Sequence, residues 1–304
     1  MNTHRLRSIL GNMNATPRKA FWVTMSISFP PRIHSLRDDI VTSLPRVPND
    51  RYSLATLQAL PTHALISAFI TWRMRFIPAK PRTVKIWPGG VTPMQFRIAA
   101  PKLRPLLNKV EAGKDLTPHL SEQVRTKGVV LDGKRGKYGR QDIDMVLTRE
   151  GLHHFHVGVS SAGNPKGRSG SLVFAEVLDK EFRIVAISDH QAFQRGSPEQ
   201  LRFFRICHAY MAKDVPPGQG FMPNPVMSSG HSMLVTMFGV KCDDEMKRLD
   251  PLLEDPEFID KLYQGQSVVR PAKPSLAWHF EDLMFGVLER QTTVFFCIFP
   301  FFAR

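Results

Sequence analysis

Cysteine is scarce in this chain of 304 residues. The three cysteines, Cys207, Cys242 and Cys297, are odd in number and widely spaced, and no two of them form a Cys-x-x-Cys pair. This pattern argues against a disulfide framework and against a cysteine-based zinc knuckle. It favours a reducing compartment, so we expect a cytoplasmic protein.

Long apolar runs are also missing. The nearest candidates, residues 20–29 and 294–302, fall well short of the roughly 18 apolar residues that a membrane span needs. Arg5 and Arg7 precede a short apolar patch, but no clean apolar core or cleavage site follows them. The basic segment 127–140 contains no GxxxxGK[ST] pattern, so it is not a phosphate-binding loop of that kind. We expect no membrane attachment.

The composition is that of a globular protein with an uneven charge. Hydrophobic residues make up 42% of the chain and charged residues 22%, and the net charge is +14. Residues 1–150 hold 25 Lys and Arg against 10 Asp and Glu, whereas residues 151–304 hold 16 against 17. The amino-terminal half is therefore strongly basic, and the other half is nearly neutral.

The pattern of elements predicts an α+β chain in three parts. Residues 1–34 are expected to form a flexible leader, residues 35–126 a basic, mostly helical region, and residues 141–304 a largely antiparallel sheet with packed helices. The individual elements that we expect are a strand at 82–87, a helix at 94–112 interrupted by Pro101 and Pro105, a helix from Ser197 to about Met211, a strand at 231–238, and strands at 275–280 and 294–299.

Cations are interleaved with aromatic residues in the basic region, near Trp72, Phe76 and Trp87. Cationic side chains can contact phosphates and aromatic rings can stack on bases, so the pattern predicts a nucleic-acid-binding surface. The alternative is an ordinary helical surface with a solvated basic face and an aromatic core face. The candidate nucleic-acid-binding residues are Arg73, Arg75, Lys80, Arg82 and Lys85.

Residues 152–190 are the most informative stretch. From His153 to Val159 the sequence alternates, which places Phe155 and Val157 on one face of a strand and His154 and His156 on the other. Residues 171–177 and 182–187 are apolar or alternating runs that flank a short polar turn, so they predict an antiparallel hairpin. Residues 160–170 are rich in Ser and Gly, so we expect them to form a loop.

The side chains of this stretch predict acid–base chemistry. His154, His156 and His190 can serve as base, acid or metal ligand, because histidine changes its charge near neutral pH. Arg168, between glycine and serine in the loop, offers a planar cation that can bind a phosphate in two places. The alternative is structural: in a chain with eleven histidines, such a cluster can be a polar sheet face capped by a loop.

The arrangement of a His-x-His strand, an Arg-Ser-Gly loop and a Leu-Val-Phe strand followed by Asp-His resembles bacterial mobile-element and defence-type proteins. More distantly, it is similar to metal-independent ribonuclease toxins of the barnase, EndoU and RelE kind. The resemblance covers about 40 residues. It implies that His154, His156, Arg168 and His190 are catalytic, although an EndoU-like lysine and threonine cannot be placed.

From this resemblance we expect a metal-independent endoribonuclease without a cofactor, acting on RNA rather than DNA, with a neutralising protein partner as for other toxins. One histidine would take the proton of the attacking 2′-hydroxyl, another would protonate the leaving oxygen, and Arg168 would stabilise the transition state. Two alternatives stay open. One is a non-catalytic nucleic-acid-binding or interaction protein. The other is a cupin-like three-histidine metal enzyme, although the glutamate expected after His-x-His is absent.

Overall fold

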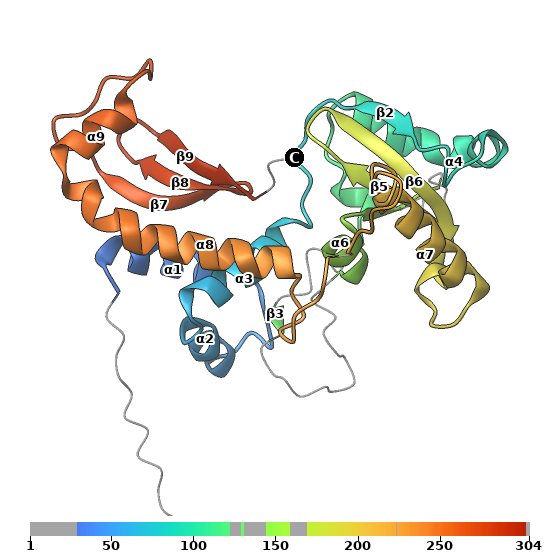
Figure 1. Cartoon of the computed structure of the whole chain (residues 1–304), viewed down its shortest axis with the longest axis horizontal. Helices are drawn as coiled ribbons and strands as arrows, with labels where there is room; N and C mark the ends of the chain where they lie inside the picture. Colours follow the sequence, from blue (N-terminus) through green and yellow to red (C-terminus); the bar gives the residue numbers. More distant parts are fainter. Residues whose placement is uncertain (1–28, 122–128, 131–143, 159–168, 223, 302–304) are drawn as a thin grey trace, which may run out of the picture.

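The fold has two lobes, which Figure 1 shows side by side. The computed structural model describes residues 29–121, 129–130, 144–158, 169–222 and 224–301. Its two larger sheets are mostly antiparallel and lie among helices, which confirms the α+β class. We call one lobe the terminal lobe, because both ends of the described chain build it, and the other the central lobe. Most of the predicted leader and nearly all of the basic segment 127–140 lie outside the described residues.

The terminal lobe joins N-terminal helices to C-terminal helices and a three-stranded sheet. Its elements are α1 (Pro31–Ser43), α2 (Arg51–Gln58), α3 (Thr62–Arg73), α8 (Met233–Leu249), η3 (Asp250–Glu254), α9 (Pro256–Tyr263), β7 (Leu276–Glu281), β8 (Met284–Glu289) and β9 (Val294–Pro300). They share one hydrophobic core, within which the rings of Trp278 and Phe285 stack at 5.3 Å. This core therefore crosses the predicted division into regions 35–126 and 141–304.

Residues 231–238 were predicted as a strand, and this prediction is wrong for most of the segment, because Met233 begins helix α8. Ser232 caps the helix by accepting a hydrogen bond from the backbone N–H of Val235 at 3.3 Å. The buried residues beyond this point recur at helical spacing, namely Val235, Phe238, Cys242, Met246 and Leu249. Gly239 allows α3 to approach, since a Cβ at this position would lie 2.5 Å from the carbonyl oxygen of His63.

The C-terminal sheet has one strand more than the sequence predicts. β8 lies within the segment expected to link the two outer strands, and it pairs antiparallel with β7 and with β9. Gly286 interrupts the alternation of this strand, and the register shifts beside it. A Cβ at Gly286 would lie 2.1 Å from the carbonyl oxygen of Phe296, so the glycine is needed for this close approach.

The central lobe is built around a four-stranded sheet. Its elements are β2 (Thr83–Ile86), α4 (Pro93–Glu111), η1 (Thr117–His119), α6 (Met145–Glu150), β4 (His153–His156), β5 (Ser171–Val177), β6 (Glu181–Asp189), η2 (His190–Phe193) and α7 (Pro198–Met211). The strand order is β2-β6-β5-β4. Strands β4, β5 and β6 pair antiparallel, which confirms the predicted hairpin, whereas β2 joins β6 in parallel.

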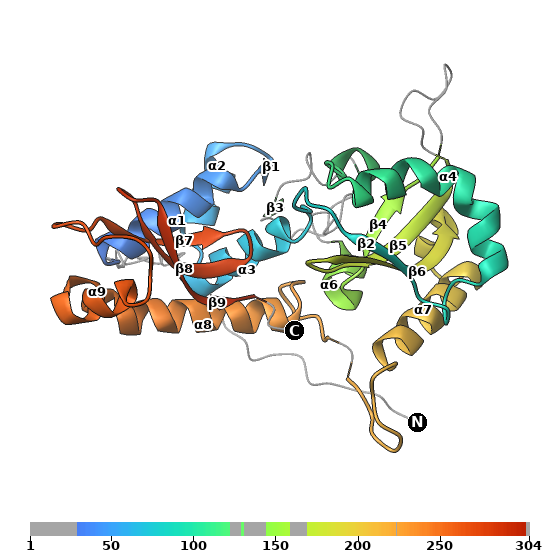
Figure 2. The ribbon, with the colours of Figure 1, turned by 90° about the horizontal axis from the view of Figure 1, so that it is seen from above.

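Both faces of the central sheet are covered, so the lobe has three layers. On one face the sheet packs against α4, through Phe155, Val173, Ile184, Leu103 and Leu106. On the other face it packs against α7, through Leu172, Phe174, Val185, Phe203 and Cys207. Figure 2 shows α4 and α7 on the two sides of the strands. The face that carries His154 and His156 is therefore partly a second core.

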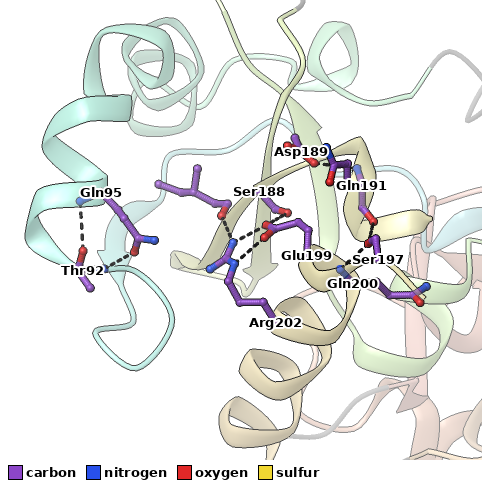
Figure 3. A network of polar contacts seen from close by, with 10 residues as sticks. Thr92, Gln95, Ser188, Asp189, Gln191, Ser197, Glu199, Gln200 and Arg202 are labelled. Atoms are coloured by element: carbon purple, nitrogen blue, oxygen red, sulfur yellow. Dashed lines mark hydrogen bonds and ion pairs between the residues drawn. The ribbon is translucent and has the colours of Figure 1, made fainter. Parts of the chain in front are cut away.

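Helix α4 is continuous, whereas the sequence predicted that Pro101 and Pro105 interrupt it. Its N-terminus has a capping box in which Thr92 and Gln95 bond each other's backbone N–H groups (Figure 3). The two prolines each remove one helical hydrogen bond. The helix nevertheless persists, and it buries a regular apolar stripe formed by Leu103, Leu106 and Val110.

A short parallel pair, β1 (Arg46–Val47) with β3 (Val129–Val130), completes the described strands. Among the described helices, none alone has both the length and the apolar character to cross a membrane. Helices α2 and α3 meet these criteria only when taken together, and they are bent by 117°.

Candidate functional site

Three of the predicted catalytic residues lie in a row on one face of the central sheet. The rings of His154 and His156 are 6.0 Å apart, and the ring of His190 lies 5.4 Å from that of His156. His154 and His156 share a face because they are two residues apart on β4. His190 reaches them because β6 ends at Asp189 and η2 begins immediately after it. We call these three side chains the histidine row.

The row runs from a buried end to the solvent. The His154 side chain is 15% exposed, and its ring lies 5.3 Å from that of Phe193 and 6.3 Å from that of Phe174. His156 is half-buried, and His190 is exposed. A substrate could therefore reach the row from the His190 end.

Asp144 lies behind the buried end of the row, and the sequence did not single it out. Its Oδ2 is 3.1 Å from Nδ1 of His154, while its Oδ1 accepts hydrogen bonds from the backbone N–H groups of Val146 and Leu147 and so caps α6. Burial would raise the pKa of Asp144, but the contact with His154 and the bond from Leu147 outweigh it and hold the pKa below its usual value. Asp144 is thus an anion beside the His154 ring, at ion-pair distance from Nδ1, although the geometry there is not that of a hydrogen bond. The only sequence signal for it was its helix-capping position.

A fixed turn places His190. Asp189 accepts a hydrogen bond from the backbone N–H of Gln191 at 2.8 Å, and the Ser197 hydroxyl donates to the Gln191 carbonyl at 2.6 Å (Figure 3). Ser197 also caps α7 by accepting from the backbone N–H of Gln200, which confirms the predicted helix start. The chain on both sides of His190 is therefore held by hydrogen bonds.

A second set of contacts ties the end of β6 to α7, also in Figure 3. Glu199 accepts hydrogen bonds from the Ser188 hydroxyl and from the guanidinium of Arg202, and Arg202 donates to the carbonyl of Ile187 at 2.8 Å. Mainly because of the bonds from Arg202, the pKa of Glu199 is below its usual value. This ion pair holds the strand that leads into His190.

His153, the fourth histidine of the stretch, lies outside the row and has a structural role. Its Nε2 donates to the carbonyl oxygen of Met74 at 2.9 Å, which links the strand to the segment that follows α3. Burial lowers the pKa of His153 to about 4, so the ring is neutral at physiological pH. A further imidazole, His119, donates from Nδ1 to the backbone carbonyl of His156 at 3.1 Å.

Arg168, the predicted phosphate-binding cation of the site, lies outside the described residues. Among the residues that are described, no group of three or more His, Cys, Asp or Glu side chains is arranged to hold a metal ion.

The predicted nucleic-acid-binding residues do not form a common exposed surface. Arg75 and Arg82 are buried, and the Arg82 guanidinium donates to the carbonyls of Leu178, Pro78 and Lys80. Arg73 pairs with Asp282 at 2.9 Å, and Lys80 pairs with Asp179. Lys85 is exposed on the edge strand β2.

Burial keeps the Arg82 guanidinium away from solvent, where a nucleic-acid phosphate would have to reach it. Its charge is used to bind three carbonyl oxygens where β2 joins the sheet, so it is not presented to a phosphate in this conformation. Other cations of the same region are exposed on α4, namely Arg97, Lys102 and Arg104. Exposed positive charge of the central lobe thus lies on α4 and β2, and also at Lys114, Lys180, Arg195 and Arg205.

Comparison with known proteins found no relative. No protein-family model matches the chain, no curated protein is similar enough to count as a match, and neither is any solved structure.

Proposed function

We propose that this protein is a metal-independent ribonuclease that uses the histidine row as its acid and base. The observation that carries the proposal is the placement of three imidazoles at ring distances of 6.0 and 5.4 Å, with a carboxylate 3.1 Å from the innermost one. Such a set supplies both partners that phosphodiester transfer requires, because one imidazole accepts a proton while another donates one.

The proposed reaction balances without a further reactant. His156, in its neutral form, takes the proton from a ribose 2′-hydroxyl, and the 2′-oxygen attacks the adjacent phosphorus. The bond from phosphorus to the 5′-oxygen breaks, and protonated His190 gives its proton to that oxygen. The products are a 2′,3′-cyclic phosphate and a 5′-hydroxyl. His154, held by Asp144, orients its neighbour, and Arg168 is the candidate for stabilising the charge of the transition state.

The test is cleavage of an RNA oligonucleotide in the presence of a chelator, with DNA of the same sequence as the matched control. We expect cleavage of RNA only, because DNA lacks the 2′-hydroxyl. We also expect a bell-shaped dependence of the rate on pH, since one imidazole must be neutral and another charged. Intact RNA, equal cleavage of DNA, or activity that disappears in chelator would refute the proposal.

A second candidate is a nucleic-acid-binding or interaction protein without catalysis. The exposed cations of α4 and Lys85 favour it, because they place positive charge on the same lobe as the row. Salt-dependent binding of RNA by a chain that cuts no RNA would select this candidate.

We infer a cytoplasmic location from the cysteines. Cys207, Cys242 and Cys297 are odd in number and widely spaced, a pattern that favours a reducing compartment. A toxin- or defence-like role would also require a protein partner that neutralises the nuclease inside the producing cell. Co-purification of such a partner with both the wild-type chain and the inactive His156→Gln chain, together with loss of RNA cleavage in the complex, would support this role, and a chain that co-purifies with no partner would count against it.

A further inference from the structure

A small pocket adjoins the histidine row. It has a volume of about 180 Å³ and lies between α6, η2 and α7. Its wall includes Met145, Arg149, Glu150, Phe193, Gln200 and Phe204. Phe193 also contacts His154, with their rings 5.3 Å apart, so one ring separates the pocket from the row. The volume is below the roughly 300–1,000 Å³ of pockets for drug-sized ligands, so it suits a single ring system.

Glu150 lines this pocket, and one of its carboxylate oxygens is an unused hydrogen-bond acceptor. The residue is 8% exposed, and its Oε1 accepts a hydrogen bond from Nε of Arg149 at 2.8 Å. Its Oε2 is buried and has no hydrogen-bond partner among the described residues. A buried carboxylate oxygen without a donor is costly, so a ligand that brings an N–H group to Oε2 would be strongly favoured.

The rest of the wall fits a flat, partly polar ring. Phe193 is 43% exposed, and the guanidinium of Arg149 lies 5.5 Å from the ring centre of Phe204. Gln200 accepts a hydrogen bond from the backbone N–H of Gly196 through Oε1, which leaves its amide nitrogen as a donor. The pocket thus combines aromatic surfaces, an acceptor and a donor, as nucleobase sites do.

We propose that this pocket binds a nucleobase that carries an exocyclic amino group, with the amino group donating to Oε2 of Glu150. The inference deepens the proposed ribonuclease function and rests on it, because it places the base of the substrate one ring away from the histidine row. The enzyme would then prefer to cut next to an amino-bearing base.

Cytidine and uridine 3′-monophosphate form a matched pair of probes, since at ring position 4 one carries an amino group and the other an oxygen. The test measures the dissociation constants of both by calorimetric titration. We expect the wild-type chain to bind cytidine 3′-monophosphate about 10-fold more tightly or better, as one hydrogen bond to a charged group would give. Equal affinities, or a preference for uridine, would overturn the inference.

The Glu150→Gln variant tests whether the carboxylate of Glu150 causes the preference for cytidine 3′-monophosphate. Its amide can donate to the oxygen of uridine, so the preference for cytidine should disappear or reverse. Glu111→Gln makes the same change of charge at an exposed position on α4 and should leave the preference intact. A preference that survives Glu150→Gln would show that the carboxylate is not the acceptor, and the inference would fall.

A third variant covers the case in which Glu150→Gln does not fold. Phe193→Ala removes a ring that is 43% exposed and should weaken the binding of both nucleotides by a similar factor. Nucleotide binding that this variant leaves unchanged would place the ligand elsewhere and overturn the inference.

Binding is measured here without cleavage, so the two proposals can fail separately. A chain that prefers cytidine 3′-monophosphate but cuts no RNA would keep the pocket and refute the nuclease. A chain that cuts RNA but binds both nucleotides equally would refute the pocket alone.

Discussion

The two lobes differ in how they treat their buried carboxylates. In the terminal lobe these groups are paired: Asp250 accepts from Arg32 at 3.0 Å and from Trp278 at 2.8 Å, and Glu289 accepts from Ser275 and Thr292. In the central lobe Glu176 is also paired, with Arg183 and Tyr210, but Glu150 leaves one oxygen unpaired, and the partly exposed Asp144 faces a histidine. Paired groups stabilise a fold, whereas unpaired or titrating groups cost stability and concentrate at functional sites. The unpaired oxygen of Glu150 and the contact of Asp144 with His154 support the proposal that the functional site lies in the central lobe.

The largest effects that we predict are losses of stability in variants of the two hydrophobic cores, one in each lobe. Phe285→Ala in the terminal lobe and Phe155→Ala in β4, on the face opposite the histidine row, each remove a fully buried ring, and each should lower the free energy of unfolding by about 3–5 kcal/mol. Only Phe155→Ala should also reduce RNA cleavage per folded molecule, because Phe155 supports the strand that carries the row. Denaturant titration with a matched activity assay measures both, and equal losses of specific activity would remove the distinction.

The second prediction concerns pH and His153. The folded chain holds this residue neutral with a pKa of about 4, whereas the ordinary value is 6.5, so the unfolded state binds more protons between these values. The stability is therefore complete above about pH 6.5 and falls by roughly 3 kcal/mol as the pH drops to about 4. His153→Gln can still donate to Met74 but does not titrate. It should flatten this part of the curve of unfolding free energy against pH, and an unchanged curve would contradict the role given to His153.

The third prediction compares two aspartates that cap helices. Asp144→Asn should keep the cap of α6, since asparagine caps well, but it removes the charge beside His154. We expect kcat to fall about 10- to 100-fold with little change in KM or in the melting temperature. Asp50 caps α2 in the terminal lobe by accepting from Ser53 at 2.7 Å, so Asp50→Asn is the matched control and should leave kcat unchanged. Equal kcat values for the two variants would mean that Asp144 serves only as a cap.

The smallest effect distinguishes a buried cation from an exposed one. Lys85→Ala should reduce the slope of log affinity for RNA against log salt by about 1, as the loss of one phosphate contact would. Arg82→Ala should instead destabilise the fold by roughly 2 kcal/mol, because three carbonyls lose a charged donor. If the Arg82→Ala chain is instead stable and shows the flatter slope of log affinity for RNA against log salt, Arg82 contacts RNA and is not a structural residue.

The sequence predicted the parts of the fold that depend on local signals. The β5–β6 hairpin follows from two runs that flank a short turn, and the start of α7 follows from Ser197 and Pro198. The short apolar run at 231–238 suits strand and helix alike, and only the spacing further along, through Cys242 and Met246, decides for α8. The parallel pairing of β2 with β6 joins distant segments, so no local pattern could show it.

The candidate site was only partly visible in the sequence. His154 and His156 were predictable as neighbours because a strand places alternate residues on one face, and His190 followed from the end of the hairpin. Asp144 and Glu150 could not be predicted as site residues. The tertiary fold brings Asp144 close to His154 and places Glu150 in a pocket with residues of η2 and α7. A carboxylate in sequence carries no sign of whether its oxygens will be paired.

The most direct test of the account is RNA cleavage by His156→Gln beside His279→Gln. Both variants replace a partly buried strand histidine with glutamine, one in the central lobe and one in the terminal lobe. The account predicts that His156→Gln loses roughly 10²–10⁴ in rate without a matching fall in melting temperature, and that His279→Gln cleaves like the wild type. If the two variants cleave RNA equally well, or if His156→Gln loses activity only in proportion to lost fold, the histidine row is scaffold and not a catalytic site.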